Sequence, residues 1–329
     1  MLLRILKSNN LISTLLIPVI GFLFWMNSFQ SPVSLDLNLA NGAMPLYYLV
    51  YHFMNGQDFW QVIIAFCLVI INSFIVVQLG YSFLFLKKRS FLPGIIYLIT
   101  VSSFQVLQSL IPVHLATLCV LISIYFIFDT YHKKEEITYT FNASFFLSLA
   151  SLFYLPVLVL FPLVWVSIFV LQKDDNWRVL IVPILGFSAP WVFMWTYSFL
   201  NDSTTHLWKE MIDTIWTVHN EYLFKPYFLL LTVVVTLLTT LGSLSVLTVY
   251  HRMKMSSRKY FVIFYWMLGL IVLAALLLIT IGIEIVALST IPVAYFISHY
   301  LLSDHKPILK EIMTWIYIGT MVFALLFYS

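Results

Sequence analysis

Residues 142 to 172 read NASFFLSLASLFYLPVLVLFPLVWVSIFVLQ, and the number of membrane passes in this stretch decides which side every later loop faces. The stretch is longer than the roughly 20 apolar residues that one span needs, and Pro156 and Pro162 interrupt it. A single span here would place the basic stretch HRMKMSSRK at 251 to 259 outside the cell, against the preference of Lys and Arg for cytoplasmic loops. We therefore predict two short passes, at about 142 to 155 and 157 to 172.

The composition of the whole chain is that of a multi-pass membrane protein. Hydrophobic residues make up 62% of the 329 residues and charged residues only 9%, whereas soluble domains carry about 25% charged residues. The basic start MLLRILKSNN leads into an apolar run without a small-residue cleavage pattern, so we expect the first helix to be retained. These features predict an all-α, polytopic transmembrane bundle that forms a single integral membrane domain over residues 1–329.

Eleven apolar runs, separated by charged clusters, are expected to cross the membrane with the N-terminus inside and the C-terminus outside. In this arrangement 15 of the 17 Lys and Arg residues lie inside, and only Lys209 and Lys225 lie outside. The outer side carries seven acidic residues, so its net charge is 2 − 7 = −5, and the overall charge of +3 reflects topology and indicates no nucleic-acid partner. The runs lie at about 11–27, 60–86, 91–106, 111–130, 142–155, 157–172, 179–199, 226–250, 260–281, 284–302 and 311–328.

Two outer segments are long enough to be more than turns, at about 28–59 and about 200–225. The first contains a proline and a glycine where a helix favours its start and its end, and apolar residues recur between them at helical spacing. We predict an interfacial helix from Pro45 to Asn55, with its tyrosines anchored at the level of the lipid headgroups. The second segment also has an apolar stripe at helical spacing, which predicts another helix lying on the surface.

The order of these features resembles the GT-C superfamily, whose members are integral membrane glycosyltransferases that depend on polyprenyl phosphate. The resemblance includes LATLCVLISIYFIFDTYHKKEE at 115–136, SFFLSLASLFYLPVLVLFPLVWVSIFVLQ at 144–172 and EIVALSTIPVAYFISHYLL at 284–302. The abundance of Phe, Ile, Tyr and Asn is also similar to that of inner-membrane families of Bacteroidota. The resemblance implies a GT-C-like fold in a bacterial inner membrane, in contact with the lipid bilayer and with a polyprenyl-phosphate lipid.

The resemblance also implies which residues form the site on the outer face. GT-C chemistry asks for a carboxylate in the first outer loop and for groups that hold the carrier phosphate. Asp36 is the candidate catalytic base, Lys225 and His114 are candidates for holding the phosphate, and Glu284 is expected to line the pocket. The chain departs from the superfamily pattern because many members have paired acidic residues in this loop, whereas Asp36 is followed by a leucine.

Each of these residues also has a simpler interpretation. Asp36 can keep an exposed loop soluble, Asp58 can interact with the dipole at a helix start, and Glu284 can begin the tenth span. His114 and Lys225 can reach water from the end of a span. His52 with Asp36 and Asp58 could surround a divalent metal ion, but no tight ligand spacing such as HExxH supports a metal site.

Two other classes of function stay open. A non-catalytic membrane scaffold or assembly factor that keeps the fold explains the missing acidic pair and the scarcity of outer cations. A transporter of lipids or small solutes would show buried charges within spans and helices broken by Gly or Pro. The sequence contains neither GxxxxGK[ST] nor GxGxxG, so no nucleotide cofactor is expected.

Overall fold

The computed structural model describes residues 11–32, 44–54, 56–84, 86, 89–131, 136–171, 177–202, 204–205, 208–209, 211–212, 226–277, 282, 284–303 and 307–328. Over these residues the chain is all-helical and contains no strand. The α-helices are α2 (Leu11–Gln30), α3 (Pro45–Met54), α4 (Asp58–Phe83), α5 (Leu92–Ser102), α6 (Pro112–Asp129), α7 (Glu136–Phe153), α8 (Pro162–Leu171), α9 (Trp177–Leu200), α11 (Pro226–Val249), α12 (Met255–Leu277), α13 (Ile285–Leu302) and α14 (Pro307–Tyr328). Short 3-10 helices are η2 (Gln105–Gln108), η3 (Leu155–Leu160) and η4 (Tyr250–Arg252).

Proline marks the start of many of these helices. The helices α3, α6, α8, α11 and α14 each begin on a proline. Proline suits this position because its missing N–H is one of those that find no partner inside a helix, and its ring fixes φ near the helical value. Prolines in the sequence therefore define where several of the apolar helices begin.

Each of the eleven predicted apolar runs contains a helix, and seven helices within the described residues are long and apolar enough to cross a membrane. These seven are α4, α6, α9, α11 with η4, α12, α13 and α14. Among the helices that are too short to cross a membrane, α5 is the most relevant to function. It has only 11 residues, all of them buried. At 1.5 Å per residue it is about 17 Å long, which is well short of a hydrocarbon core of about 30 Å.

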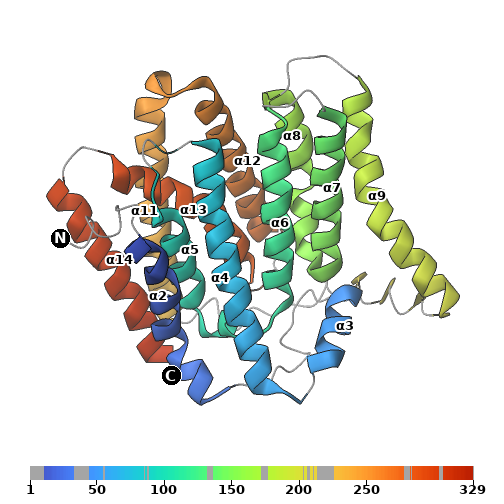
Figure 1. Ribbon diagram of the computed structural model, residues 1–329, viewed down its shortest axis with the longest axis horizontal. Helices are drawn as coiled ribbons and strands as arrows, with labels where there is room; N and C mark the ends of the chain where they lie inside the picture. The colour runs from blue at the N-terminus through green and yellow to red at the C-terminus, as the bar shows by residue number, and fades with distance from the viewer. Residues whose placement is uncertain are drawn as a thin grey trace.

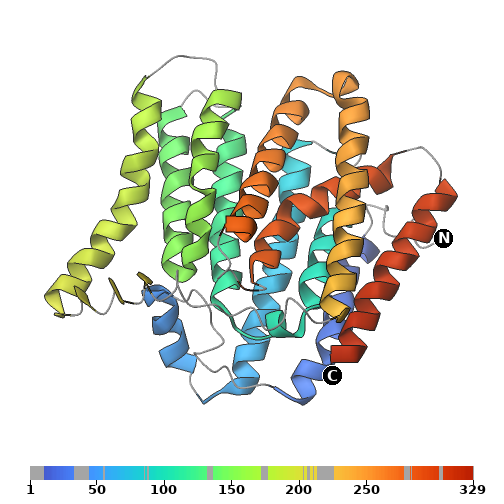
Figure 2. The same cartoon turned by 180° about the vertical axis from the view of Figure 1, so that it is seen from behind.

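The stretch 142–172 contains two helical segments, as its two prolines indicated. The first is α7, which ends at Phe153, and the second consists of η3 and α8, which end at Leu171. Figures 1 and 2 show the two segments side by side and running in opposite directions. Tyr154 lies at the turn between them in an extended conformation.

The helices form a bundle around α13, which crosses its centre obliquely (Figures 1 and 2). In α13, 78% of the apolar 18-residue stretch is buried inside the protein, compared with 28% of the corresponding stretches in α9, α11 and α14. The upper end of the bundle in Figure 1 contains the starts of α7, α9 and α12, and the lower end contains α3 and the start of α6. The end of α9 diverges from its neighbours at the lower end, where Phe193, Phe199 and Leu200 are exposed.

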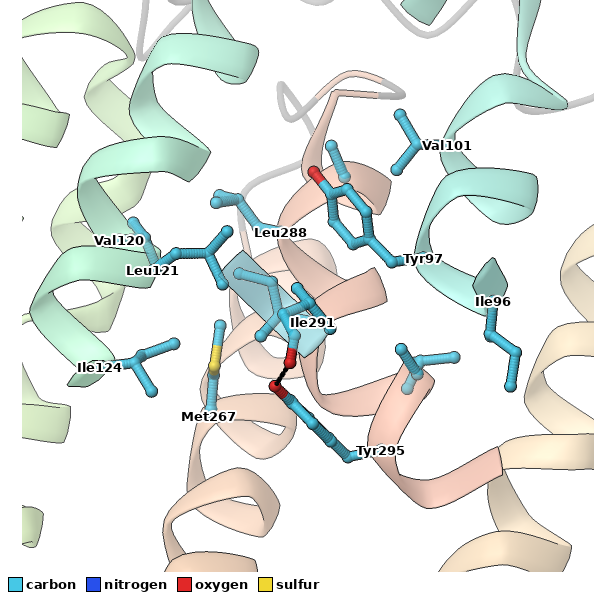
Figure 3. Packing of buried hydrophobic residues seen from close by; sticks show 14 of the residues in the cluster. Ile96, Tyr97, Val101, Val120, Leu121, Ile124, Met267, Leu288, Ile291 and Tyr295 are labelled. Carbon is cyan, nitrogen blue, oxygen red and sulfur yellow. Dashed lines mark hydrogen bonds between the residues drawn. The ribbon is translucent and has the colours of Figure 1, made fainter. Parts of the chain in front are cut away.

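Close backbone contacts and a continuous apolar core hold α13 in this position. Gly242 of α11 lies against the backbone of α13, because a Cβ atom at this glycine would lie 2.6 Å from the carbonyl carbon of Phe296. Figure 3 shows Leu121 and Ile124 of α6, Met267 of α12 and Ile291 of α13 packed together. The Tyr295 hydroxyl donates a hydrogen bond of 2.6 Å to the carbonyl of Val76 in α4.

The segment predicted as an interfacial helix is helical, and α3 has the predicted start at Pro45 and an end at Met54. Gly56 follows it with a φ of +79°, a conformation that favours glycine. Phe53 on the apolar stripe is 77% exposed, so this face of α3 is available to lipid. Tyr47, however, is fully buried in the protein rather than placed among lipid headgroups. The second predicted surface helix, within 200–225, lies largely outside the described residues.

Candidate functional site

Four of the six candidate residues lie within the part of the chain that the structure describes. Glu284 and His114 are buried, His52 is exposed on α3, and Asp58 is half-exposed in the first turn of α4. Asp36 and Lys225 lie outside the described residues, and their predicted roles therefore stay predictions. The two buried residues, Glu284 and His114, are the starting point of the candidate site.

Glu284 immediately precedes α13 as its N-cap residue and is only 2% exposed. Its Oε2 atom is buried and has no hydrogen-bond partner among the described residues. A buried carboxylate oxygen without a partner is costly, because it has lost its hydration without gaining a hydrogen bond. Unpaired polar groups of this kind are uncommon in cores and are a reason to suspect a functional site.

Tyr154 connects Glu284 to the segment that contains Asp36. Tyr154 is 1% exposed and lies within electrostatic range of the Glu284 carboxyl group. One residue earlier, the carbonyl of Phe153 accepts a hydrogen bond of 3.3 Å from the backbone N–H of Met44. Met44 is the first described residue after 33–43 and directly precedes α3, so the middle of the first outer segment is attached next to Tyr154.

His114 is fully buried near the start of α6, and its ring contacts the irregular connection between α5 and α6. Its Nε2 atom lies 2.8 Å from the carbonyl oxygen of Leu107, and the Asn72 side-chain amide donates to the carbonyl of His114 at 3.2 Å. The Nδ1 atom of His114 has no partner among the described residues. This position shows that the ring does not reach the surface of the protein.

The connection between α5 and α6 is stabilised by side chains that bind its free carbonyl groups. In addition to His114, Tyr47 of α3 donates to the carbonyl of Leu110 at 2.6 Å, and Gln108 donates to the carbonyl of Ser102 at 2.5 Å. Burial raises the pKa of the Tyr47 phenol, and its neighbours Tyr51 and Tyr48 add to this effect, so the phenol remains a donor. Irregular backbone within an apolar bundle requires such partners, because lipid offers none.

Asn72 and Tyr97 were not predicted from the sequence, but both belong to the buried polar region. Both are fully buried, and the Tyr97 hydroxyl lies within interaction range of the Asn72 side-chain amide. In Figure 3 the Tyr97 hydroxyl points towards the beginning of α13. Asn72 stands in the apolar run LVIINSFIVV, where a polar residue is a functional candidate by default, whereas the sequence gives no comparable signal for Tyr97.

We define the buried polar centre as Asn72, Tyr97 and His114, which lie next to one another, and consider with it Glu284, whose electrostatic neighbour is Tyr154. Each contributes a buried side-chain atom without a hydrogen-bond partner among the described residues, and they come from α4, α5, α6 and the start of α13. The Asn72 Oδ1 and Glu284 Oε2 atoms are acceptors, and His114 Nδ1 is an acceptor when Nε2 carries the proton that faces Leu107. The centre can therefore receive hydrogen bonds from a polar group.

The structure does not bring His52 and Asp58 into this centre. The described residues include no group of three or more His, Cys, Asp or Glu side chains that could hold a metal ion. The metal site that the sequence left open included Asp36 as a ligand. Asp36 lies outside the described residues, so the structure does not test this site.

Comparison of the chain with protein-family models, with curated proteins and with solved structures finds no match.

Proposed function

We propose that this protein is a GT-C-like membrane glycosyltransferase that uses a polyprenyl-phosphate-linked sugar at the outer face of a bacterial inner membrane. The observation that supports the proposal most directly is the buried carboxyl group of Glu284, whose Oε2 atom has no hydrogen-bond partner among the described residues and which lies within electrostatic range of Tyr154, next to the point where Met44 is attached. All eleven apolar helical segments would cross or enter the membrane, with the lower end of the bundle in Figure 1 outside.

The proposed reaction needs one base and one site for the leaving group. The acceptor hydroxyl attacks the anomeric carbon of the sugar, the bond from that carbon to the phosphate oxygen breaks, and polyprenyl phosphate leaves. Asp36 accepts the proton of the acceptor hydroxyl, and Lys225 neutralises the released phosphate. Glu284 lines the pocket, while His114 positions the α5–α6 connection through its contact with Leu107.

A complementation experiment tests this proposal. In a strain that lacks the protein, Asp36→Asn and Glu284→Gln should fail to restore function although the variants are expressed at the wild-type level. Base catalysis alone is typically worth about 10²- to 10⁴-fold, so the loss through Asp36→Asn should be severe. Asp58→Asn is the matched control, because Asp58 is a half-exposed acidic residue at a helix start and should complement fully.

Transport is the second candidate, and a specific observation favours it. The helix α5 is short and completely buried, and an irregular connection joins it to α6 beside the buried polar centre. Discontinuous helices next to a binding site are typical of secondary transporters. Substrate-dependent proton or sodium flux in proteoliposomes, lost in Glu284→Gln, would place transport ahead of glycosyl transfer.

A further inference from the structure

The loop between α11 and α12 gathers positive charge at the upper end of the bundle, away from Tyr154. Arg252 and Lys254 are exposed, and Arg258 is half-buried in the first turns of α12. We call these three residues the α11–α12 basic cluster. They lie within seven consecutive residues, so one small anion can be reached by more than one of them.

The part of the chain that carries this cluster has no acidic residue of its own. The sequence from 226 to 283 contains no Asp or Glu. The Arg258 guanidinium lies over the ring of Tyr250 at 5.7 Å, and its buried Nε atom has no hydrogen-bond partner among the described residues. The guanidinium keeps its positive charge at any physiological pH, and its planar group of N–H donors matches the geometry of an oxyanion.

Exposed apolar side chains lie on the two helices that flank the basic cluster. Leu244 and Leu247 in the last turns of α11 are 57% and 55% exposed, and Met255 at the start of α12 is 63% exposed. The surface therefore presents cations at the ends of the helices and apolar side chains within one to three turns of them. A phospholipid has the same division between a charged headgroup and apolar chains.

We propose that the α11–α12 basic cluster binds the phosphate of an anionic phospholipid, whose acyl chains lie along Leu244 and Leu247. Juxtamembrane clusters of Lys and Arg attract anionic lipids by about 1 kcal/mol for each cation, which corresponds to about five-fold in affinity. The competing occupant is the chain's own segment 172–176, which carries Asp174 and Asp175 and follows Leu171. Lys259, next to Arg258, donates to the carbonyl of Leu171 at 3.2 Å, so this segment starts nearby.

Native mass spectrometry of the full chain in detergent tests the proposal with phosphatidylglycerol and phosphatidylcholine of identical acyl chains. The wild type should bind phosphatidylglycerol preferentially at 0.1 M salt and lose most of the preference near 1 M, where the screening length falls from about 10 to about 3 Å. Lys254→Gln should weaken phosphatidylglycerol binding about five-fold. The triple variant Arg252→Gln, Lys254→Gln, Arg258→Gln should weaken it by about two orders of magnitude.

Lys209→Gln is the matched control, because Lys209 is exposed in the segment after α9 and should leave the lipid preference unchanged. The proposal is overturned if the wild type binds both lipids equally at 0.1 M salt. It is also overturned if a folded, monodisperse triple variant keeps the wild-type preference, or if only Asp174→Asn, Asp175→Asn creates a preference that the wild type lacks. Polyprenyl phosphate binding at the lower end should survive the triple substitution, so this test is separate from that of the proposed function.

Discussion

The phenol of Tyr47 donates a hydrogen bond of 2.6 Å to the backbone carbonyl of Leu110, across 63 positions in the sequence. This bond attaches the surface helix α3 to the irregular connection between α5 and α6. Both partners are buried, so the Leu110 carbonyl has no access to water if the phenol is removed. The bond therefore couples the position of α3 to the geometry of the buried polar centre through His114 and Leu107.

Replacing Tyr47 with phenylalanine should destabilise the protein by about 1–3 kcal/mol, because it leaves a buried carbonyl without a donor. Thermal unfolding in detergent measures the effect. Tyr48→Phe is the control, because Tyr48 is only partly buried on the same helix, and its loss should be smaller. Equal stability of Tyr47→Phe and the wild type would show that α3 is not attached in this way.

Apolar runs and prolines predicted the positions of the helices because both signals are local. The start of α3 at Pro45 and the turn between α7 and α8 follow from the properties of proline. The buried polar centre could not be predicted in full, because it depends on contacts between helices that are distant in sequence. Asn72 is a polar residue in an apolar run, a signal not used in the sequence-based prediction, and only the packing of α5 against α4 and α13 shows that Tyr97 lies beside it.

Gly242 should be essential for the packing of α11 on α13. Adding a methyl group there places it in contact with the Phe296 carbonyl, and backbone cannot move aside as a flexible side chain can. Gly242→Ala should therefore destabilise the protein by about 1–3 kcal/mol. The control is Gly269→Ala in α12, where the new methyl group meets no atom within 4 Å. That change should be neutral or stabilising by up to about 1 kcal/mol, because alanine favours helix. A stable Gly242→Ala variant would contradict the close approach of the two helices.

Glu284→Gln separates a functional carboxylate from one that only begins a helix. If the Glu284 carboxyl group is kept for function, replacing it with an amide should stabilise the folded protein by about 1–3 kcal/mol, because a neutral amide is less costly to bury than a carboxyl group with an unpaired oxygen. Activity should be lost at the same time. A structural role at the helix start predicts the opposite pair of results, a less stable protein that keeps its function. Thermal unfolding and complementation of the same variant distinguish the two.

The proposed orientation is tested by single cysteines placed at Ser256 and Asn201 in a background without Cys67 and Cys119. A membrane-impermeant thiol reagent should label the cysteine at position 201 from outside intact cells, and the cysteine at 256 only after the membrane is opened. Lys and Arg residues around 251–259 set this expectation. Outside labelling at position 256 would reverse the sides of α12 and would remove the argument for two passes in 142–172.

We propose that the lower end of the bundle binds a polyprenyl-phosphate lipid. The lipids that purify with the protein test this proposal most directly. Lipid extracts of the purified full chain are analysed by mass spectrometry, before and after incubation with polyprenyl phosphate, for the wild type and for Lys225→Gln. The proposal predicts polyprenyl phosphate or its glycosylated form on the wild type and at least ten-fold less on the variant, roughly the 1.4 kcal/mol expected for one lost polar contact. A wild type that carries only phospholipids, and that retains no added polyprenyl phosphate, would contradict the proposed function.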